Sequence, residues 1–518
     1  MERVNAWKTY DLELQKECLD FAEDYRRFIS ENKTERECVD TFVNLAEDAG
    51  YVELSRLIEE NARTGRQLQP GDKVYMTWMN KSMILFRLGS RPLEEGLNIL
   101  GAHIDNPRMD VKQDPMYEKG GLGYLDTHYY GGIKTYQFVA RALAIHGVVV
   151  KKNGETVVLN VGEDPDDPVF FVSDILIHLA KNQMTKSAAE AVSGEALDVV
   201  IGSKPLIIDA DTKRAGEKGG SGDAACPSPE GSGASVEPDG AAASSGSGSA
   251  ADTAKEAVKS ALLEILKEQY GFEEEDFASA ELEVVPAGPA RDAGFDRSLI
   301  LGYGHDDRSC AYPSFRAIMD AAFDGGADAP ERTSVCLLVD KEEIGSVGAT
   351  GMQARYFENA VAEVMNLCGQ YSDLSLRRCL ADSCMLSNDV NAGYDPCWAE
   401  CFDEKNSAFL GCGVSFMKFT GSGGKSFSND ANAEYMAHLR DIFDREGIVY
   451  QTSELGKVDA GGGGTIAYIP ALYGMNVVDT GVPVLSMHSP AEACSKADLF
   501  EAYRGYKAFL KDANLRNS

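Results

Sequence analysis

The sequence predicts an α/β fold in which helices flank a mixed β-sheet, together with a second domain that is rich in β-strands. Three observations lead to this prediction. The 518 residues exceed what one compact core of ordinary size holds, so two or more domains are expected. The hydrophobic content of 44% is that of a globular protein. After residue 296, short apolar runs alternate with segments of helical periodicity, which is typical of α/β domains.

The first third of the chain reads as helices followed by strands. Residues 12–30 and 36–50 place apolar side chains at helical spacing, and polar cap residues separate the two segments. From about residue 73 the pattern changes to short β-like runs broken by polar turns, at 73–79, 82–89 and 96–105. Further strand signals extend from Leu122 to about Val158, and residues 172–183 then have the periodicity of an amphipathic helix.

A low-complexity segment interrupts this pattern at residues 213–256. Gly, Ser, Ala and Pro dominate it, and large apolar side chains are almost absent. Such a segment cannot bury enough apolar surface to offset the entropy that is lost on ordering. We therefore expect a disordered surface insertion, after which helical periodicity resumes.

Charge and composition exclude several classes of function. A formal net charge of −32 disfavours nucleic-acid binding, which needs clustered Lys and Arg. The N-terminal residues lack the apolar core of a signal peptide, and no window approaches the roughly 18 apolar residues of a membrane span. The 12 cysteines are scattered rather than arranged as a disulfide framework, so we expect a cytoplasmic protein with reduced thiols.

Five strand-like runs end in a histidine or a carboxylate. The residues at these ends are His103, Asp306, the adjacent pair Glu342 and Glu343, Asp389, and His488. Ligand sites of open α/β sheets lie outside the carboxyl ends of the strands, so we expect these side chains to meet in one site. Chance would scatter such residues over helices and sheet faces.

This set matches the ligands that two divalent metal ions require. A catalytic zinc ion usually takes about three protein ligands plus water, so two ions need about six protein contacts. Five side chains would supply these six contacts if one carboxylate among them bridges both ions. They are His103, Asp306, Glu343, Asp389 and His488. Glu342 is left without a ligand role, and we predict that it is the general base for a water molecule activated by both ions.

Several motifs resemble the aspartyl-aminopeptidase family of dinuclear zinc aminopeptidases. In chain order they are "GAHIDNPRMDVK", "HYYGGIKTYQ", "GHDDRSCAYPSF", "DKEEIGSVGATG", "SNDVNAGYDP", "GGGGTIA" and "MHSPAEACSKADLF". The set extends from about residue 70 to the C-terminus apart from the low-complexity insertion, and in this order it is specific. The form "GGIKTYQ" departs from the Trp-containing form of eukaryotic relatives and is closer to bacterial members, so a strict preference for acidic substrate residues is not implied.

The resemblance implies roles for individual residues. The ligands of one zinc ion would be His103, Asp306 and Asp389, and those of the other would be Asp306, Glu343 and His488. Glu342 would be the base, and Asp105 would orient an imidazole ligand. Mn²⁺ or Co²⁺ could replace Zn²⁺, because sites made of His and carboxylates also accept these ions.

The resemblance also implies domain boundaries and an assembly. Residues 1–112 and 296–518 would form the catalytic domain, and residues 113–295 would be an inserted oligomerisation or lid domain. Relatives assemble as tetrahedral dodecamers in which a histidine of the inserted domain reaches the active site of a neighbouring subunit. His178 lies where that histidine is expected, so the resemblance implies a homo-oligomer, with the dodecamer as its model, and a catalytic role for His178.

Other candidate residues have simpler alternatives. The glycine run could be only a flexible turn, but in a peptidase Gly463 and Gly464 would let a substrate backbone approach closely. Lys418 could be solvated, or it could receive an acidic substrate side chain as a point charge. Asp307 is most simply a local ion-pair partner or a helix cap. Without the resemblance, His178 is most simply a partly buried, hydrogen-bonded histidine on its helix.

We therefore predict a metallo-aminopeptidase that hydrolyses N-terminal residues from peptides, with acidic residues as one candidate preference. A dipeptidase or deacylase on the same metal scaffold is an alternative, although it would lack the long inserted domain. A catalytically silent assembly protein is another, and it would be favoured if Glu342 or a ligand had been replaced. The expected partners are peptide substrates and further copies of the chain, with no nucleic acid and no membrane.

Overall fold

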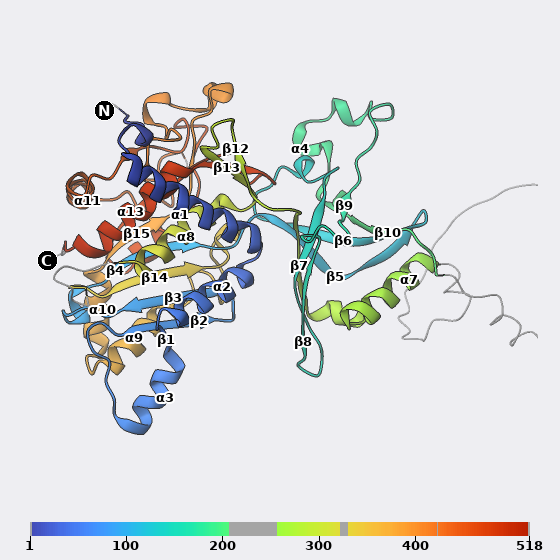
Figure 1. The fold of residues 1–518 in the computed structure, drawn as a ribbon. Helices are drawn as coiled ribbons and strands as arrows, with labels where there is room; N and C mark the ends of the chain where they lie inside the picture. Colours follow the sequence, from blue (N-terminus) through green and yellow to red (C-terminus); the bar gives the residue numbers. More distant parts are fainter. Residues whose placement is uncertain (1–2, 207–255, 322–329, 422, 516–518) are drawn as a thin grey trace, which may run out of the picture.

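The computed structural model describes residues 3–206, 256–321, 330–421 and 423–515. It shows two domains, one built around a nine-stranded sheet and the other around a seven-stranded sheet (Figure 1). The predicted α/β fold with a mixed sheet and a β-rich second domain is therefore confirmed. The predicted disordered insertion, apart from its last residue, lies outside the described residues.

The nine-stranded sheet is mixed. Its strand order is β1 (Val52–Glu53), β2 (Lys73–Trp78), β3 (Ser82–Arg87), β14 (Ser334–Val339), β4 (Asn98–His103), β15 (Cys384–Asn388), β19 (Asn476–Gly481), β17 (Val414–Met417) and β18 (Tyr450–Thr452). The central strands β14, β4, β15 and β19 are parallel, whereas β3 and β17 run antiparallel to β14 and β19. The carboxyl ends of four parallel strands therefore lie along one edge of the sheet.

Both faces of this sheet are buried, because alternate side chains of its strands enter two different cores. In β3, Ile84 and Phe86 enter the first core and Met83 and Leu85 the second. The helices of the first core are α3 (Leu54–Thr64), α9 (Tyr356–Leu367) and α10 (Asp373–Ala381). Those of the second are α1 (Leu12–Glu31), α2 (Glu35–Asp48), α8 (His305–Met319), α11 (Ala433–Arg445) and α13 (Lys496–Asp512). Burial on both faces explains why these strands are continuous apolar runs.

The N-terminal helices begin at the caps that the sequence indicates. The side chain of Asp11 accepts the backbone N–H of Leu14 at 2.9 Å at the start of α1. Thr34 and Glu37 form a capping box at the start of α2. The helices predicted over residues 12–30 and 36–50 closely match α1 and α2.

The second domain, taken as described residues 108–286, is an antiparallel sheet with one long helix against it. Its strand order is β8 (Thr156–Val161), β7 (Leu143–Val150), β11 (Ala280–Pro286), β5 (Arg108–Lys119), β6 (Leu122–Tyr130), β10 (Val199–Gly202) and β9 (Phe171–Val172). Helix α7 (Ala257–Ile265) packs on β5 and β6. Because β5 follows soon after β4, the chain passes directly from the edge of the larger sheet into the second domain (Figure 1).

The helix predicted for residues 172–183 is wrong. Strand β9 ends at Val172, and the chain continues through turns to a short 3₁₀ helix (Gln183–Thr185) and α4 (Ala188–Ala191). The apolar side chains that suggested an amphipathic helix are exposed, among them Ile177 and Leu179. Most helical stability in proteins comes from packing of an apolar face, and the described residues leave most of that face uncovered here.

A smaller five-stranded sheet completes the larger domain. Its strands are β12 (Arg291–Ala293), β13 (Leu299–Gly302), β21 (Glu492–Ser495), β20 (Pro483–Leu485) and β16 (Asn391–Ala392), and the short helix α12 (Tyr468–Ala471) precedes β19. The cysteines in the described part of the chain are all free. Within the same part, no helix is long and apolar enough to cross a membrane.

Candidate metal centre

The predicted ligands come from the carboxyl edge of the large sheet and from two neighbouring segments. His103 is the last residue of β4, and Asp389 directly follows β15. Glu342 and Glu343 begin a 3₁₀ turn (Glu342–Ile344) just after β14. Asp306 lies in the first turn of α8, and His488 lies in the loop between β20 and β21. The structure thus brings all five predicted ligands and Glu342 to one place, where five of the six residues line a cavity of about 500 Å³.

Asp306 is at the centre of this group. Its Oδ1 atom lies 3.2 Å from Nε2 of His103, and its Oδ2 atom lies 3.0 Å from Nε2 of His488. Nε2 of His103 is also 4.0 Å from Asp389, and Nε2 of His488 is 3.5 Å from Glu343. One carboxylate therefore faces two different imidazoles with its two oxygens, which is the arrangement of a bridging ligand between two half-sites.

The chemistry of these residues fits divalent metal ions. Ligand atoms of His103, Asp306 and Glu343 all lie within 4.8 Å of one another. Among the described residues, the buried Oε1 of Glu343 has no hydrogen-bond partner. Burial, with the nearby Asp306 carboxylate, raises the pKa of Glu343 well above its usual value. A buried carboxylate cluster of this kind is costly unless cations compensate it, and imidazole with carboxylate is a ligand set of zinc.

Asp105 takes the predicted orienting role. Nδ1 of His103 lies 3.0 Å from the carbonyl oxygen of Asp105 and 3.3 Å from its Oδ1. The carboxylate of Asp105 also accepts the backbone N–H groups of Glu342 and Glu343, each at 3.2 Å. Because an imidazole that donates from Nδ1 leaves Nε2 free to ligate, Asp105 directs Nε2 of His103 into the site.

Glu342 lies beside the ligands without joining them. It lines the cavity together with Asp306 and Glu343. Burial, opposed by His103 and assisted by Asp105 and Asp306, raises the pKa of Glu342 to about 7. A carboxylate in that range can both accept and return a proton near neutral pH, which is what a general base in hydrolysis must do.

Two buried carboxylates at the site were not assigned correctly from the sequence. Glu492 accepts the backbone N–H of His488 at 2.7 Å and that of Asp306 at 3.1 Å, so it holds the backbone of two ligands. Asp307 accepts the backbone N–H of His103 at 3.3 Å, and its neighbour Arg308 donates instead to backbone carbonyls. The local ion pair or helix cap expected for Asp307 is therefore replaced by a contact to a ligand strand.

Other predicted residues fall into two groups. Gly463 and Gly464 line the same cavity, and the space in front of Gly464 is open. Lys418 is not among the residues that line this cavity. Its ammonium contacts Asp430 at 2.5 Å, a carboxylate that also contacts Lys425 at 3.1 Å. The cavity wall next to the ligands is instead formed largely by uncharged side chains, namely those of Val390, Met417, Thr420, Leu455 and Met487.

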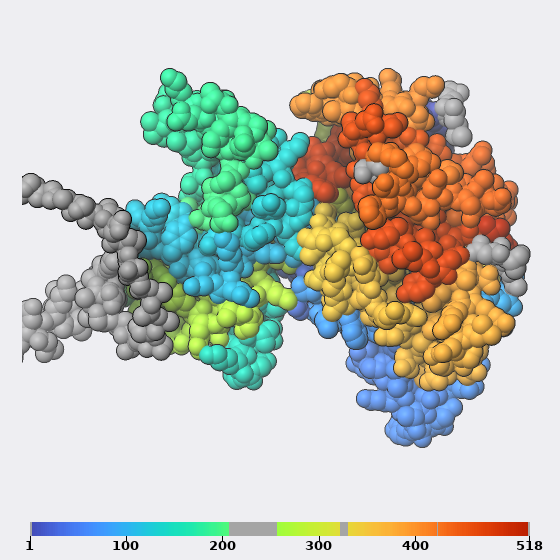
Figure 2. All heavy atoms as spheres, turned by 180° about the vertical axis from the view of Figure 1, so that it is seen from behind, coloured from blue at the N-terminus to red at the C-terminus, as the bar shows by residue number. Residues whose placement is uncertain are grey.

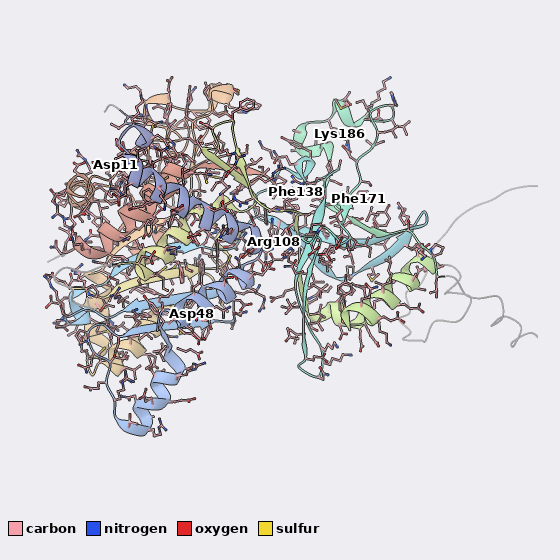
Figure 3. The ribbon with its side chains drawn as sticks, in the orientation of Figure 1. Asp11, Asp48, Arg108, Phe138, Phe171 and Lys186 are labelled. Atoms are coloured by element: carbon pink, nitrogen blue, oxygen red, sulfur yellow. The ribbon has the colours of Figure 1, made fainter. Side chains whose placement is uncertain are left out.

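His178 is on the second domain and does not line this cavity. Its side chain is exposed within the turns that follow β9, so it is not the partly buried helical histidine that the sequence pattern suggested. Figure 2 shows that the segment that contains it, drawn in green, projects from the second domain away from its sheet. Lys186, which follows in the same projection, points outward in Figure 3.

Comparisons with known proteins agree with this chemistry. The family model described as "Aminopeptidase I zinc metalloprotease (M18)" matches residues 28–510. A "Probable M18 family aminopeptidase 1" from Clostridium acetobutylicum is 49% identical over 99% of this chain and 98% of that protein. A protein of the same description from Thermotoga maritima is 38% identical over 99% of both chains.

Solved structures give the same result for the fold. The crystal structure of aminopeptidase I from Clostridium acetobutylicum matches with a TM-score of 0.82 and 47% identity, over 98% of this chain and 99% of that chain. The M18 aminopeptidase from Thermotoga maritima matches with a TM-score of 0.84 and 37% identity, over 99% of this chain and 100% of that chain. A structure described as the "S. cerevesiae mApe1 dodecamer" shares the fold at 20% identity, with a TM-score of 0.70 over 95% and 96% of the two chains.

Proposed function

Because the chain belongs to the M18 family of zinc aminopeptidases, we propose that it removes N-terminal residues from peptides with two zinc ions per subunit. The ligands are His103, Asp306 and Asp389 for one ion, and Asp306, Glu343 and His488 for the other. The observation that carries this proposal is the position of Asp306, whose two oxygens face the Nε2 atoms of two different histidines at 3.2 and 3.0 Å.

The ions, Glu342 and the glycines next to the ligands each have a separate role in the reaction. Two divalent ions bound there would polarise the peptide carbonyl and acidify a water molecule. Glu342 accepts the proton of the attacking water and delivers it to the leaving amine, from a carboxylate whose pKa of about 7 suits both steps. The glycines at 463 and 464 let the substrate backbone approach the ligands, because they add no side chain to the cavity wall.

The cavity favours a neutral N-terminal side chain over an acidic one. Its wall beside the ligands carries Val390, Met417 and Leu455, and Lys418, the cation predicted to receive an acidic side chain, is paired with Asp430. An acidic substrate side chain would lose its hydration there without gaining a partner. We therefore assign the enzyme to peptides with apolar or other uncharged N-terminal residues.

A homo-oligomer is the second part of the proposal. Five large apolar side chains in one stretch of the second domain are 47–69% exposed, namely Ile175, Leu176, Ile177, Leu179 and Met184. Exposed apolar surface of this kind marks interfaces between proteins. The related yeast structure is described as a dodecamer. We propose that this stretch packs on another copy of the chain and brings His178 to the active site of that copy.

Metal content and substrate form test the proposal directly. The purified protein should bind two Zn²⁺ per chain, lose activity with a chelator and regain it with Zn²⁺, Mn²⁺ or Co²⁺. It should hydrolyse a tripeptide with a free amine and spare the same tripeptide after N-acetylation. Cleavage of the acetylated form would instead favour the deacylase alternative, and cleavage of dipeptides alone would favour a dipeptidase. A cytoplasmic location stays a prediction.

A further inference from the structure

The motif "HYYGG" contributes to neither the ligands nor the base, yet its end reaches the metal centre. We propose that Tyr130–Gly132, at the carboxyl end of β6, is a positioning segment that the second domain supplies to both halves of the metal centre within the same chain. The inference rests on the proposed function, because it concerns ligands of the two ions. Its three residues act on three different groups of the site.

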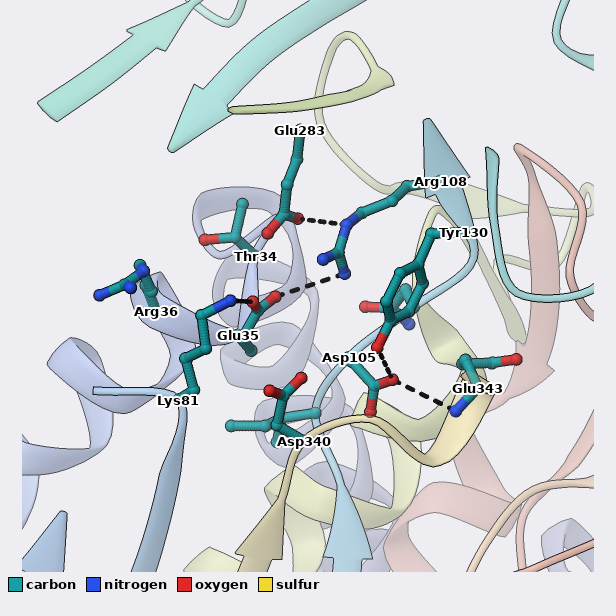
Figure 4. A network of polar contacts seen from close by, with 12 residues as sticks. Thr34, Glu35, Arg36, Lys81, Asp105, Arg108, Tyr130, Glu283, Asp340 and Glu343 are labelled. Atoms are coloured by element: carbon teal, nitrogen blue, oxygen red, sulfur yellow. Dashed lines mark hydrogen bonds and ion pairs between the residues drawn. The ribbon is translucent and has the colours of Figure 1, made fainter. Parts of the chain in front are cut away.

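Tyr130 positions the proposed ligand His103 through Asp105. Its hydroxyl donates to Oδ2 of Asp105 at 2.8 Å, and the side chain is buried (Figure 4). Asp105 in turn contacts Nδ1 of His103 and accepts the backbone N–H of Glu343. A fixed Asp105 therefore orients one imidazole ligand and the turn that carries another ligand, so the Tyr130 hydroxyl affects both through a single hydrogen bond.

Gly132 positions the proposed ligand His488. Its carbonyl oxygen lies 2.9 Å from Nδ1 of His488. A carbonyl can only accept, so Nδ1 of His488 carries the proton and Nε2 presents its lone pair to the site. That Nε2 is the atom that lies 3.0 Å from Asp306. The backbone of the second domain therefore selects the ligating tautomer of His488.

Gly131 leaves room for a ligand between these two contacts. Its φ of +74° is in the left-handed region, and a Cβ at this position would lie 3.3 Å from both Cβ and Oε2 of Glu343 and 3.3 Å from Cβ of Pro107. That approach is tighter than nine in ten ordinary Cβ contacts, so with a larger side chain here Glu343 or Pro107 would have to shift by a few tenths of an ångström. The glycine thus permits the segment to lie directly against a ligand.

Arg108 anchors the segment at the junction of the two domains. Its guanidinium stacks 4.1 Å from the centre of the Tyr130 ring. It also pairs with Glu283 of β11 at 3.1 Å and with Glu35 of α2 at 3.4 Å, and Glu35 pairs with Lys81 at 2.9 Å. Figure 4 shows this network leading from α2 to Asp105, and Figure 3 places Arg108 between the domains. Docking of the second domain is therefore linked to the geometry of the ligands.

The substitution Tyr130→Phe tests the first contact, because it removes only the hydroxyl and keeps the ring on Arg108. Loss of a group that orients a ligand typically costs about 10–100-fold in metal affinity or activity, so we expect at least about a tenfold weaker Zn²⁺ affinity in competition with a chromophoric chelator. The absorption spectrum of the Co²⁺-loaded enzyme should also shift. Tyr117→Phe is the matched control, because that hydroxyl donates to Asp198 elsewhere in the same sheet.

The substitution Gly131→Ala tests the close approach. Gly121, at the other end of β6, is its matched control, because it has a similar φ of +79° and open space in front of it. Both alanines add similar backbone strain at positive φ, and only the alanine at residue 131 also meets Glu343 and Pro107. Only Gly131→Ala should weaken metal binding.

The outcomes separate this inference from the proposed function. If the unmodified protein binds two ions, while Tyr130→Phe and Gly131→Ala bind them within about twofold of their controls, the segment has no positioning role and the proposed function stands. If the unmodified protein binds no ions, the proposed function fails and this inference fails with it. Weaker binding and a shifted Co²⁺ spectrum in both variants, but in neither control, support it.

Discussion

The metal centre and the exposed stretch of residues 175–184 show how differently two functional regions of one chain can be built. At the metal centre, the backbone N–H groups of the predicted ligands Asp306 and His488 both donate to Glu492 of the same chain. In the stretch 175–184, apolar side chains such as Ile177 and Leu179 are each 67% exposed. The predicted ligands and the base all come from one chain, whereas the apolar side chains of the stretch 175–184 are left uncovered by the described residues.

The comparison shows that the two ends of the second domain have different roles. Its inner end, at Tyr130 and Gly132, contacts the active site of its own chain. Its outer end, around His178, is directed away from its own sheet (Figure 2). A single domain can therefore serve two active sites, one through the junction within the chain and one through the assembly. We therefore expect mutations at the two ends to have different effects.

At the metal centre, Glu342→Gln should produce the largest effect on kcat. The amide cannot accept the proton of the attacking water, so kcat should fall by about 10²–10⁴-fold or more while both metal ions remain. Glu343→Gln is the comparison variant, because it replaces a proposed ligand and should lower metal content as well. Steady-state kinetics combined with metal analysis distinguishes the two. Near-normal kcat in a fully loaded Glu342→Gln enzyme would contradict the assignment of the base.

His178→Ala should produce the next largest effect, and only through the assembly. A donor to the developing negative charge of the substrate carbonyl is worth about 2.7–4 kcal/mol, or roughly 10²–10³-fold in kcat. Metal content should not change, because His178 is not among the proposed ligands, and its side chain is exposed in the fold of its own chain. Measuring kcat, metal content and oligomeric state on one preparation checks all three.

Mixing two inactive chains sharpens this test. When Glu342→Gln and His178→Ala chains exchange subunits, some sites receive Glu342 from one chain and His178 from another, and activity should partly return. Each variant after exchange with itself is the control. If exchange is demonstrated by a mass label and no activity returns, His178 does not act on a neighbouring subunit, and the stretch 175–184 loses its proposed purpose.

Substrate preference should produce a smaller effect. With p-nitroanilide substrates, kcat/KM for leucine should exceed that for aspartate by about tenfold or more, because an acidic side chain would lie unpaired against Met417 and Leu455. Lys418→Ala should leave this ratio unchanged, since its ammonium is already paired with Asp430. A preference for aspartate that disappears in Lys418→Ala would show that the lysine turns into the cavity.

The sequence predicted which residues meet at the site better than it predicted what holds them there. His103, Asp389 and the glutamate pair were predictable because strand ends can be read from apolar runs, and parallel strands end at one edge. The contacts of Glu492, Tyr130 and Gly132 were not predictable, because they depend on residues far away in the chain that only the fold brings near. The pairing of Lys418 with Asp430 was not predictable for the same reason, and the role of Lys418 towards substrate stays a prediction.

The false helix at residues 172–183 has a different cause. Its periodicity is real, but an amphipathic pattern only predicts that an apolar face will be buried somewhere, not that a helix forms on this chain alone. Low local helix stability leaves such a segment dependent on its partner. The error therefore coincides with the region for which we propose an intermolecular contact.

The smallest predicted effect concerns the junction of the two domains. His146 of β7 is fully buried, with Nδ1 2.8 Å from Glu37 of α2 and Nε2 3.2 Å from Glu163. Burial alone would lower the pKa of His146, but its hydrogen bonds to Glu163 and Glu37 outweigh it, so the pKa is raised above the usual value. Lys33 also lies near this pair, with its ammonium 3.9 Å from Glu163.

A raised pKa in the folded state means that protonation of His146 stabilises the junction. This contribution is fully present below the unfolded pKa of about 6.5 and is lost as pH rises through the higher folded value. His146→Gln should therefore lower Tm most near pH 6, by about 1–3 °C, and progressively less at higher pH. Comparing the two proteins at each pH cancels the titration of the many other carboxylates. A difference in Tm that grows with pH would contradict this prediction, because it would mean that the pKa of His146 is lowered in the fold and that the neutral imidazole is the stabilising form.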